Sequence, residues 1–385
     1  MFSRRTEWKL TPNCLTQALE EARNAGRELL DLTISNPTRA GIEYDEGILQ
    51  AFGDPAALHY DPQPKGLLSA RHAVAEYYAP QGGVDPESLI LTTSTSEAYS
   101  YVFRLLCNPD DEILIPKPSY PLFEFLADLQ DVRLATYPLL YDHGWQIDFP
   151  SLEKAVTPRT RGIVLVHPNN PTGSYVSDAE RAGLNDFCQR RNLALIVDEV
   201  FLDYAIDGGL RRSCISNSEV LTFALSGVSK ISALPQMKLG WIAANGPADP
   251  LEEALSRLEV IADTYLSLNA PVQRAARVLL DQRHTVQKQL LERVRGNLAE
   301  LDRQLAGQKA CARLAVEGGW NVVLRVPATQ SDEDLAIELL RKGGVLVHPG
   351  HFYDFPRDGY LILSLITPMA QFSEGVERAL KLLAV

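Results

Sequence analysis

The chain has 385 residues, of which 45% are hydrophobic and 22% charged, so it can form a large domain plus a smaller one and has no room for an extensive disordered tail. Its formal net charge is −12 and no run of Lys or Arg stands out, which excludes nucleic acid and anionic membrane as expected partners. No uncharged apolar stretch approaches about 18 residues, so neither export nor membrane insertion is predicted. Small-molecule chemistry is the favoured class of function.

The cysteines indicate a reducing compartment. They are five in number, widely spaced and never arranged as C-x-x-C. This pattern argues against a disulfide framework and against a zinc site. We therefore predict a cytoplasmic protein without a structural metal.

Seven short apolar runs follow one another through the first two thirds of the chain, most of them separated by segments of helical period. They cover residues 89–92, 112–115, 132–137, 162–167, 193–198, 220–226 and 239–244. Continuous rather than alternating apolar runs are typical of strands buried on both faces of a sheet that helices cover. The pattern predicts one large α/β domain over residues 45–270.

The C-terminal part has a different pattern. A long amphipathic stretch near 271–307 predicts a helix that leads out of the large domain. Short strands are then expected in 318–326, 345–350 and 360–365, with a helix near 331–342. Residues 271–385 are therefore predicted to form a smaller α+β domain together with the N-terminal arm, 1–44.

Polar residues follow several of the predicted strands. Ser94 and Glu97 form a capping-box pattern, which predicts a helix N-terminus able to bind an anion or simply a well-capped helix. The stretch PNNPTG, 168–173, either lines a ligand crevice or only builds a turn. Asp198 ends an apolar run, so its carboxylate must find a partner or take up a proton.

Lys230 stands in SGVSKISALPQMKLGW, residues 226–241. A lysine that is desolvated near a strand end loses its proton more easily and can attack a carbonyl group; the alternative is an ordinary surface lysine. Taken together, these residues offer an anion site, an acid, an amide and an amine. Pyridoxal 5′-phosphate (PLP) needs these four groups.

The order of these motifs resembles that of the fold-type I aminotransferases of class I/II, the aspartate aminotransferase-like group. PNNPTG is followed by Asp-Glu, 28 residues after Asn170, and by Ser-Lys, 32 residues after Asp198. The resemblance covers nearly the whole chain. It implies the PLP-transferase fold of type I, with a mainly parallel seven-stranded sheet between helices and a smaller α+β domain. It also implies a PLP-dependent transaminase that moves an amino group between an amino acid and a 2-oxo acid.

The resemblance implies catalytic roles for four residues. Lys230 would form a Schiff base with PLP and move protons. Asp198 would pair with the pyridine nitrogen, Asn170 would donate a hydrogen bond to the phenolic oxygen, and Tyr120 would stack on the ring.

A further group of residues would hold the phosphate. Thr95 and Ser96 would offer backbone N–H groups, Ser229 a hydroxyl and Lys238 a positive charge. Tyr60 resembles the tyrosine that reaches the phosphate of the neighbouring subunit. This implies a homodimer with shared active sites, and Asn269 falls in a segment that would also cross the dimer interface.

Three departures from the family pattern concern the cofactor shell and the substrate turn. Phe201 stands where the family usually has a tyrosine, and Lys238 replaces the usual arginine. Ser35, followed by Asn36, replaces the glycine of the turn that binds the substrate carboxylate.

The fourth departure concerns the substrate itself. Ile362 stands where the family has its carboxylate-binding arginine. Arg39 or Arg357 could replace that arginine, although a surface role is the alternative for each. His348 and His351 could also donate to a carboxylate.

Two features of the sequence concern the specificity of the substrate pocket. The second arginine of dicarboxylate-specific members is not evident, which disfavours aspartate and glutamate as substrates. Tyr265 and Trp320 could line a more apolar pocket or only pack in a core.

Two other functions remain as alternatives. A PLP-dependent lyase that breaks carbon–sulfur bonds by β-elimination could use the same scaffold. A regulator that binds PLP without turnover is less favoured, because Lys230 is retained and the acidic charge opposes DNA binding.

Overall fold

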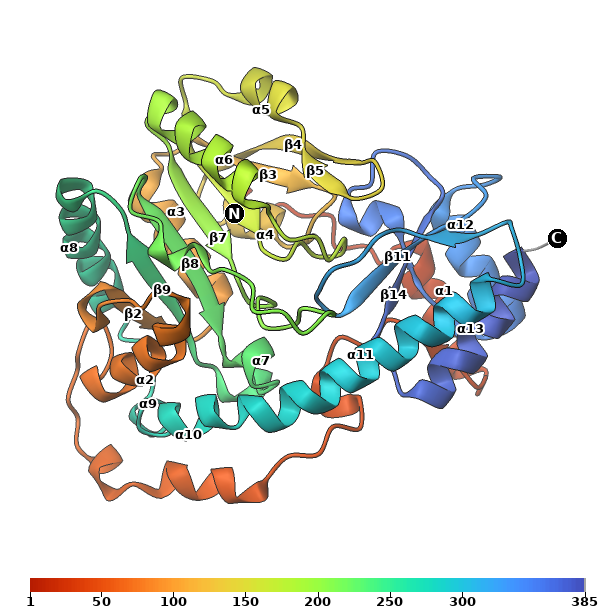
Figure 1. Cartoon of the computed structure of the whole chain (residues 1–385), viewed down its shortest axis with the longest axis horizontal. Helices are drawn as coiled ribbons and strands as arrows, with labels where there is room; N and C mark the ends of the chain where they lie inside the picture. The colour runs from red at the N-terminus through yellow and green to blue at the C-terminus, as the bar shows by residue number, and fades with distance from the viewer. Residues whose placement is uncertain (384–385) are drawn as a thin grey trace.

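The computed structural model describes residues 1–383. Figure 1 shows two groups of elements. The larger group, on the left, is a central sheet covered by helices, and the smaller group, on the right, consists of helices and strands. The long helix α11 (Arg283–Leu305) runs from the first group to the second. This arrangement agrees with the large and small domains that the sequence predicts.

The central sheet has eight strands in the order β2-β9-β8-β7-β6-β3-β4-β5. Their bounds are β2 (Leu89–Thr92), β3 (Glu112–Lys117), β4 (Arg133–Tyr141), β5 (Trp145–Ile147), β6 (Thr160–Val166), β7 (Ala194–Asp198), β8 (Thr222–Gly227) and β9 (Gly240–Asn245). The neighbours from β4 to β8 are parallel, and β9 is antiparallel to both β8 and β2. The predicted mainly parallel sheet is confirmed.

The predicted number of seven strands is one too low. The eighth strand, β5, has three residues and pairs antiparallel with the end of β4 at the edge of the sheet. Its partly exposed residues form no continuous apolar run, and continuous apolar runs were the sequence signal from which the other strands were predicted.

Helices cover both faces of the sheet, which explains the continuous apolar runs. In β7, Ile196 packs with the cluster that includes α3 (Thr95–Leu106) and α8 (Ala248–Tyr265). Its neighbours Leu195 and Val197 pack on the opposite face with residues of α5 (Phe149–Ala155) and α6 (Asp178–Arg191). Successive residues of a strand point to opposite faces, so a strand covered on both sides needs apolar residues throughout.

Short helices join the large domain to α11. Helices α9 (Ala270–Arg274) and α10 (Ala276–Asp281) pack against α2 (Leu68–Tyr78) in a cluster shared with the sheet. These helices lie beyond residue 270 and still pack with the large domain. The division at 270/271 stays a proposal. The two remaining helices of the large domain are α4 (Phe123–Asp128) and α7 (Val228–Ile231).

The small domain is built on a four-stranded antiparallel sheet in the order β10-β11-β14-β13. The strands are β10 (Ala312–Arg313), β11 (Asn321–Arg325), β13 (His348–Pro349) and β14 (Tyr360–Ser364). Helices α1 (Cys14–Asn24), α12 (Asp332–Glu338) and α13 (Met369–Leu383) pack around this domain.

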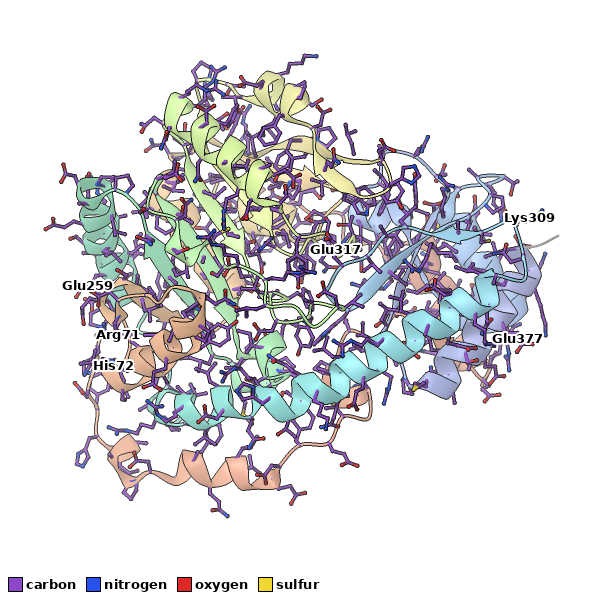
Figure 2. The ribbon with its side chains drawn as sticks, in the orientation of Figure 1. Arg71, His72, Glu259, Lys309, Glu317 and Glu377 are labelled. Carbon is purple, nitrogen blue, oxygen red and sulfur yellow. The ribbon has the colours of Figure 1, made fainter. Side chains whose placement is uncertain are left out.

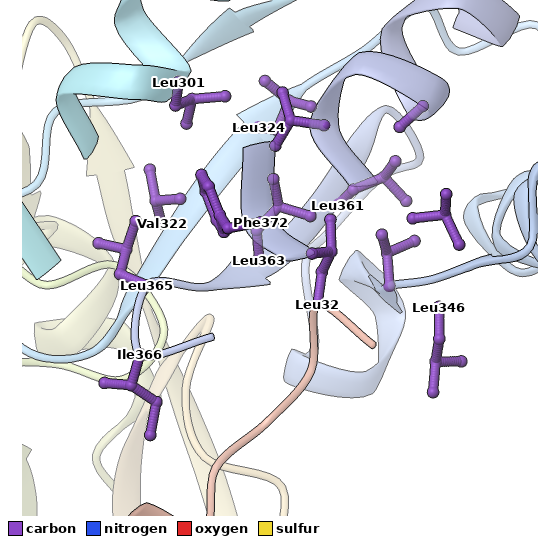
Figure 3. Packing of buried hydrophobic residues seen from close by; sticks show 14 of the residues in the cluster. Leu32, Leu301, Val322, Leu324, Leu346, Leu361, Leu363, Leu365, Ile366 and Phe372 are labelled. Atoms are coloured by element: carbon purple, nitrogen blue, oxygen red, sulfur yellow. The ribbon is translucent and has the colours of Figure 1, made fainter. Parts of the chain in front are cut away.

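Part of the N-terminal arm packs against the small domain. β1 (Leu30–Asp31) pairs in parallel with β12 (Val345–Leu346). Figure 3 shows Leu32, just after β1, beside Leu361 and Leu363 of β14 and Phe372 of α13. Leu32 of the arm therefore lies in the same buried cluster as residues of the C-terminal strands and helix.

Within residues 1–383, no helix has the length and apolar character needed to cross a membrane. All five cysteines are free thiols.

Candidate active site

The carboxyl ends of five strands of the central sheet place their following residues around one cavity of about 380 Å³. Thr95 follows β2, Tyr120 follows β3, and Asn170 follows β6. Asp198 ends β7, and Lys230 follows β8. Parallel strands open their carboxyl ends at the same edge of a sheet, and ligands of α/β proteins bind there. Residues far apart in the sequence therefore meet in one site.

Lys230 lies on α7 with its amine buried in this cavity. Burial lowers the pKa of Lys230 to about 8 and outweighs the charge of Asp198, which acts in the opposite direction. The Nζ atom lies 4.9 Å from the ring centroid of Trp320 and 5.6 Å from that of Phe201. Tyr204 holds the backbone by donating a hydrogen bond of 2.6 Å to the Lys230 carbonyl. About a tenth of the amine is therefore neutral at pH 7, far more than for a lysine with an ordinary pKa, and the neutral form is the nucleophile.

Asp198 is also buried, and burial raises the pKa of its carboxyl group to about 6. Two hydrogen bonds oppose this shift. Tyr99 Oη donates to Oδ2 at 3.1 Å, and the Val200 N–H donates to Oδ1 at 3.1 Å. These donors favour the ionised form, so Asp198 can offer a carboxylate to a protonated ring nitrogen.

Asn170 and Tyr120 complete the cofactor side of the cavity. Asn321, from the small domain, donates from Nδ2 to Asn170 Oδ1 at 2.8 Å. This bond fixes the orientation of the Asn170 amide and leaves its nitrogen without a partner among residues 1–383. Tyr120 is partly exposed at the cavity, with its ring edge-on to Phe123.

The predicted phosphate residues are only partly brought together. Ser94 is the N-cap of α3 and accepts from the Glu97 N–H at 3.2 Å, while Glu97 bonds back to the Thr93 N–H rather than to Ser94. Thr95, at the first turn of α3, and Ser229 line the cavity. Ser96 and Lys238 are exposed and are not among its lining residues.

Two residues predicted to act between subunits lie in a different place. Tyr60 and Asn269 line a separate surface hollow of about 420 Å³. The side chain of Tyr60 is 84% exposed. Neither residue reaches the cavity of its own chain, so their predicted roles depend on a second subunit.

The predicted substrate residues also divide into two groups. Ser35 lines the cavity, whereas Asn36, Arg39 and Arg357 do not. The guanidinium of Arg357 instead donates to Tyr360 Oη at 3.2 and 3.3 Å. Of the two arginines considered as substitutes, neither lies at the cavity wall.

Of the aromatic and histidine residues considered for the site, some line the cavity and others lie outside it. Phe201, Trp320 and His348 line the cavity. His351 is exposed, and Tyr265 lies outside the cavity with its ring stacked on that of Tyr101.

Several lining residues were not foreseen from the sequence. They are Thr33, Ile34, Pro121, Leu122, Val166, Val200, Asn321, Tyr353 and Ser364. Tyr99, which donates a hydrogen bond to Asp198, was also not predicted from the sequence. Asn321 stands in the predicted strand 318–326, GGWNVVLRV, and a polar residue inside an apolar strand was the one available signal.

The residues present fit PLP. Asp198 can pair with the ring nitrogen, and Asn170 can donate to the phenolic oxygen. Lys230 offers the amine for the aldehyde, and the N-terminus of α3 at Thr95 suits a phosphate.

Comparison with known proteins decides the family. The model of the family described as "Aminotransferase class I and II" matches residues 27–374. The chain belongs to this family. This confirms the predicted family and, with it, a transaminase that uses PLP and takes an amino acid and a 2-oxo acid as substrates.

Relatives of this class I/II aminotransferase match over most of its length. It is 26% identical to the glutamate-pyruvate aminotransferase AlaA of Haemophilus influenzae over 374 residues, which cover 93% of this chain and 91% of the relative. It is 28% identical to the alanine aminotransferase of Mycobacterium tuberculosis over 372 residues, which cover 92% and 85% of the two chains.

Solved structures agree with the fold of this aminotransferase. The alanine aminotransferase of Pyrococcus furiosus superposes with a TM-score of 0.91 at 22% identity and covers 100% of this chain and 99% of that one. A double mutant of the Thermus thermophilus aspartate aminotransferase superposes with a TM-score of 0.86 at 23% identity, with both chains covered completely. The predicted fold type is confirmed.

Proposed function

We propose that this aminotransferase acts on a monocarboxylic amino acid and the matching 2-oxo acid, with alanine and pyruvate as the first pair to test. The observation that carries the proposal is the composition of the cavity wall. Among residues 1–383, Lys230 is the only lysine or arginine that lines the cavity. A second carboxylate on the substrate would therefore meet no fixed cation of this chain. Alanine and pyruvate, which appear in the names of the relatives, agree with this choice, whereas the glutamate of the glutamate-pyruvate aminotransferase carries a second carboxylate and does not.

We assign the residue roles as follows. The neutral amine of Lys230 would hold the cofactor through its aldehyde, with loss of water, and, once released from it, would take up the proton from the substrate α-carbon. Asp198 would hold a proton on the pyridine nitrogen, and the hydrogen bonds from Tyr99 and the Val200 N–H favour the ionised form of Asp198. Asn170 would donate to the phenolic oxygen, and Tyr120 would lie against the ring. When bound, PLP supplies an electron sink for the negative charge left on the α-carbon.

We also propose a homodimer and a cytoplasmic location. The exposed Tyr60 and the hollow it shares with Asn269 support contact with a second subunit. The five free thiols support a reducing compartment.

The test is a spectroscopic titration of the purified protein with PLP. Single amino acids are added first alone and then with pyruvate, and ammonia is assayed in the same sample. A monocarboxylic amino acid should convert the visible cofactor band completely, and pyruvate should restore it without release of ammonia. Spontaneous return of the band together with ammonia would instead support the lyase alternative. Lys230→Ala should abolish the reaction with every amino acid.

A further inference from the structure

The substrate side of the cavity is formed by the small antiparallel sheet. His348 of β13 is paired directly with Ile362 of β14, and directly paired residues of antiparallel strands point to the same face. Ser364 lies two residues further along β14 on that face, where it pairs with Asn321 of β11. His348, Ser364 and Asn321 all line the cavity, and we call them the polar wall.

Two of these three side chains already donate a hydrogen bond within the protein. Asn321 Nδ2 donates one of its two N–H groups to Asn170 Oδ1 at 2.8 Å, and Ser364 Oγ donates to the Ile34 carbonyl at 2.5 Å. His348 differs from both. Its Nδ1 is hydrogen-bonded to Tyr353 Oη at 3.2 Å, and its Nε2 has no hydrogen-bond partner within residues 1–383. The ring nitrogen of His348 thus remains available to a ligand, together with the second N–H of Asn321, and His348 alone of the three can carry a positive charge.

We propose that His348 binds the carboxylate of the substrate through Nε2, and that Tyr353 is a positioning residue that holds the imidazole ring by Nδ1. The inference rests on the proposed function, because an amino acid and a 2-oxo acid both carry a carboxylate. It assigns to a histidine a contact for which the cavity wall, as formed by residues 1–383, offers no arginine. A carboxylate accepts a strong hydrogen bond from a protonated imidazole.

The surroundings of His348 make this contact dependent on pH. Burial lowers the pKa of His348, and the nearby charge of Asp31 opposes this shift. The turn Gly350–Tyr353 beside β13 carries His351 and Tyr353, and β14 carries Tyr360. Helix α12, which also packs against β13, carries Asp332, Glu333, Asp334 and Glu338, and Lys230 lines the same cavity. His348 is therefore mainly neutral in the free enzyme near pH 7.

An arriving carboxylate favours the imidazolium form, so binding should take up a proton. Affinity for the carboxylate is greatest below the pKa of His348 in the free enzyme. It falls, by up to about tenfold per pH unit, until the pH passes the higher pKa of His348 in the complex.

Isothermal titration calorimetry of the PLP-loaded enzyme tests this without turnover. The probes are propionate and 3-phenylpropionate, each compared with its amide, in two buffers of different ionisation enthalpy. We expect uptake of up to about one proton and about 10- to 100-fold tighter binding of at least one acid than of its amide. His348→Gln should remove both effects, and Tyr353→Phe should weaken them. His351→Gln is the matched control, because His351 belongs to the same loop and is exposed, and it should change neither.

Binding of both acids by the wild-type enzyme without proton uptake and no more tightly than their amides would overturn the proposal, whichever variants fold. Unchanged proton uptake in a folded His348→Gln enzyme that retains its visible cofactor band would overturn it as well. Transamination is assayed separately. If the enzyme fails to transaminate but binds the acids with proton uptake at His348, the proposed function is wrong and the assignment of His348 as the carboxylate-binding residue still holds.

Discussion

At the residue scale, burial moves the pKa values of the two central charged groups toward each other. The amine of Lys230 titrates at about 8 and the carboxyl group of Asp198 at about 6. In both cases desolvation penalises the charged form and is the largest cause. Hydrogen bonds and the attraction between the two groups limit the shifts. The protein thereby prepares a partly neutral amine beside a carboxylate that is still mostly ionised at pH 7.

The pKa of Lys230 leads to the first prediction. Only the neutral amine can bond to the aldehyde of PLP, so the rate of PLP uptake by the cofactor-free protein should rise with pH and level off above about pH 8. Stopped-flow absorbance between pH 6.5 and 9.5, with PLP as the probe, measures this rate. A lysine with an ordinary pKa, about 10.4, would instead give a rate that still rises at the top of this range.

The hydrogen bond from Tyr99 to Asp198 leads to the second prediction. This bond lowers the pKa of Asp198, so Tyr99→Phe should raise that pKa and move the acid limb of the kcat/KM profile to higher pH. We also expect a loss of about 3- to 10-fold in kcat/KM near pH 7, the equivalent of one ordinary hydrogen bond.

Tyr101→Phe is the control for this change. Tyr101 is buried in the same helix, α3, but makes no hydrogen bond to Asp198. An acid limb that shifts equally in both variants would contradict the assigned role of Tyr99.

At the element scale, hydrogen bonds join the turn after β6 to the segment before β11. The carbonyl of Gly173 accepts from the N–H groups of Glu317 at 3.1 Å and Gly318 at 2.9 Å. Glu317, labelled in Figure 2, lies where the loops of the large domain meet the small domain. Its carboxylate also accepts from the Tyr175 N–H at 3.0 Å. This junction fixes the Asn170 turn relative to Asn321 and so joins the two walls of the site.

Gly173→Ala tests the junction. Gly173 has a φ of +68°, and a Cβ placed there would lie 2.4 Å from the Gly318 carbonyl oxygen. Both the left-handed backbone and the contact oppose a side chain, so we expect a loss of stability of about 2–4 kcal/mol together with weaker PLP binding. Thermal unfolding followed by visible absorbance and by fluorescence measures both effects.

Gly144→Ala provides the comparison, because nothing lies within 4 Å of a Cβ at that position. It should leave both the unfolding temperature and PLP binding nearly unchanged. If Gly173→Ala behaves like Gly144→Ala, the junction does not hold the site together.

At the scale of the whole molecule, the surface around Tyr60 points to a second subunit. Leu58 and Tyr60 expose 88% and 84% of their side chains on the rim of a 420 Å³ hollow. Large exposed apolar side chains grouped in this way are typical of an interaction surface. If Tyr60 serves the site of its neighbour, one functional site needs residues from two chains.

Subunit mixing tests this arrangement. Lys230→Ala should be inactive, and Tyr60→Ala should lose most of its activity through weaker PLP binding. After the two variants are mixed, unfolded and refolded together, each mixed dimer should contain one site with both native residues. With random pairing, activity should return to about a quarter of the wild-type value. No gain over the separate variants, with dimers shown by sedimentation, would mean that Tyr60 acts elsewhere.

The sequence by itself determined the framework of the protein. Residues such as Leu195, Ile196 and Val197 must be apolar on both faces of their strand, so the seven long strands could be found as continuous apolar runs. The charged groups after the strands, above all Asp198 and Lys230, stood out because a buried carboxylate or ammonium is costly unless it is paired or neutral. The order of the motifs then suggested their roles at the cofactor.

Only the tertiary structure decided which side chains touch. Tyr99 meets Asp198 across 99 residues of chain, and Asn321 meets Asn170 across 151. The pairing of His348 with Ile362 depends on the register of two short strands. A shift of one residue would turn His348 away from the cavity. Local sequence patterns carry the burial and the chemistry of single residues, whereas contacts between distant residues depend on how elements far apart in the chain pack, within each domain and between the two.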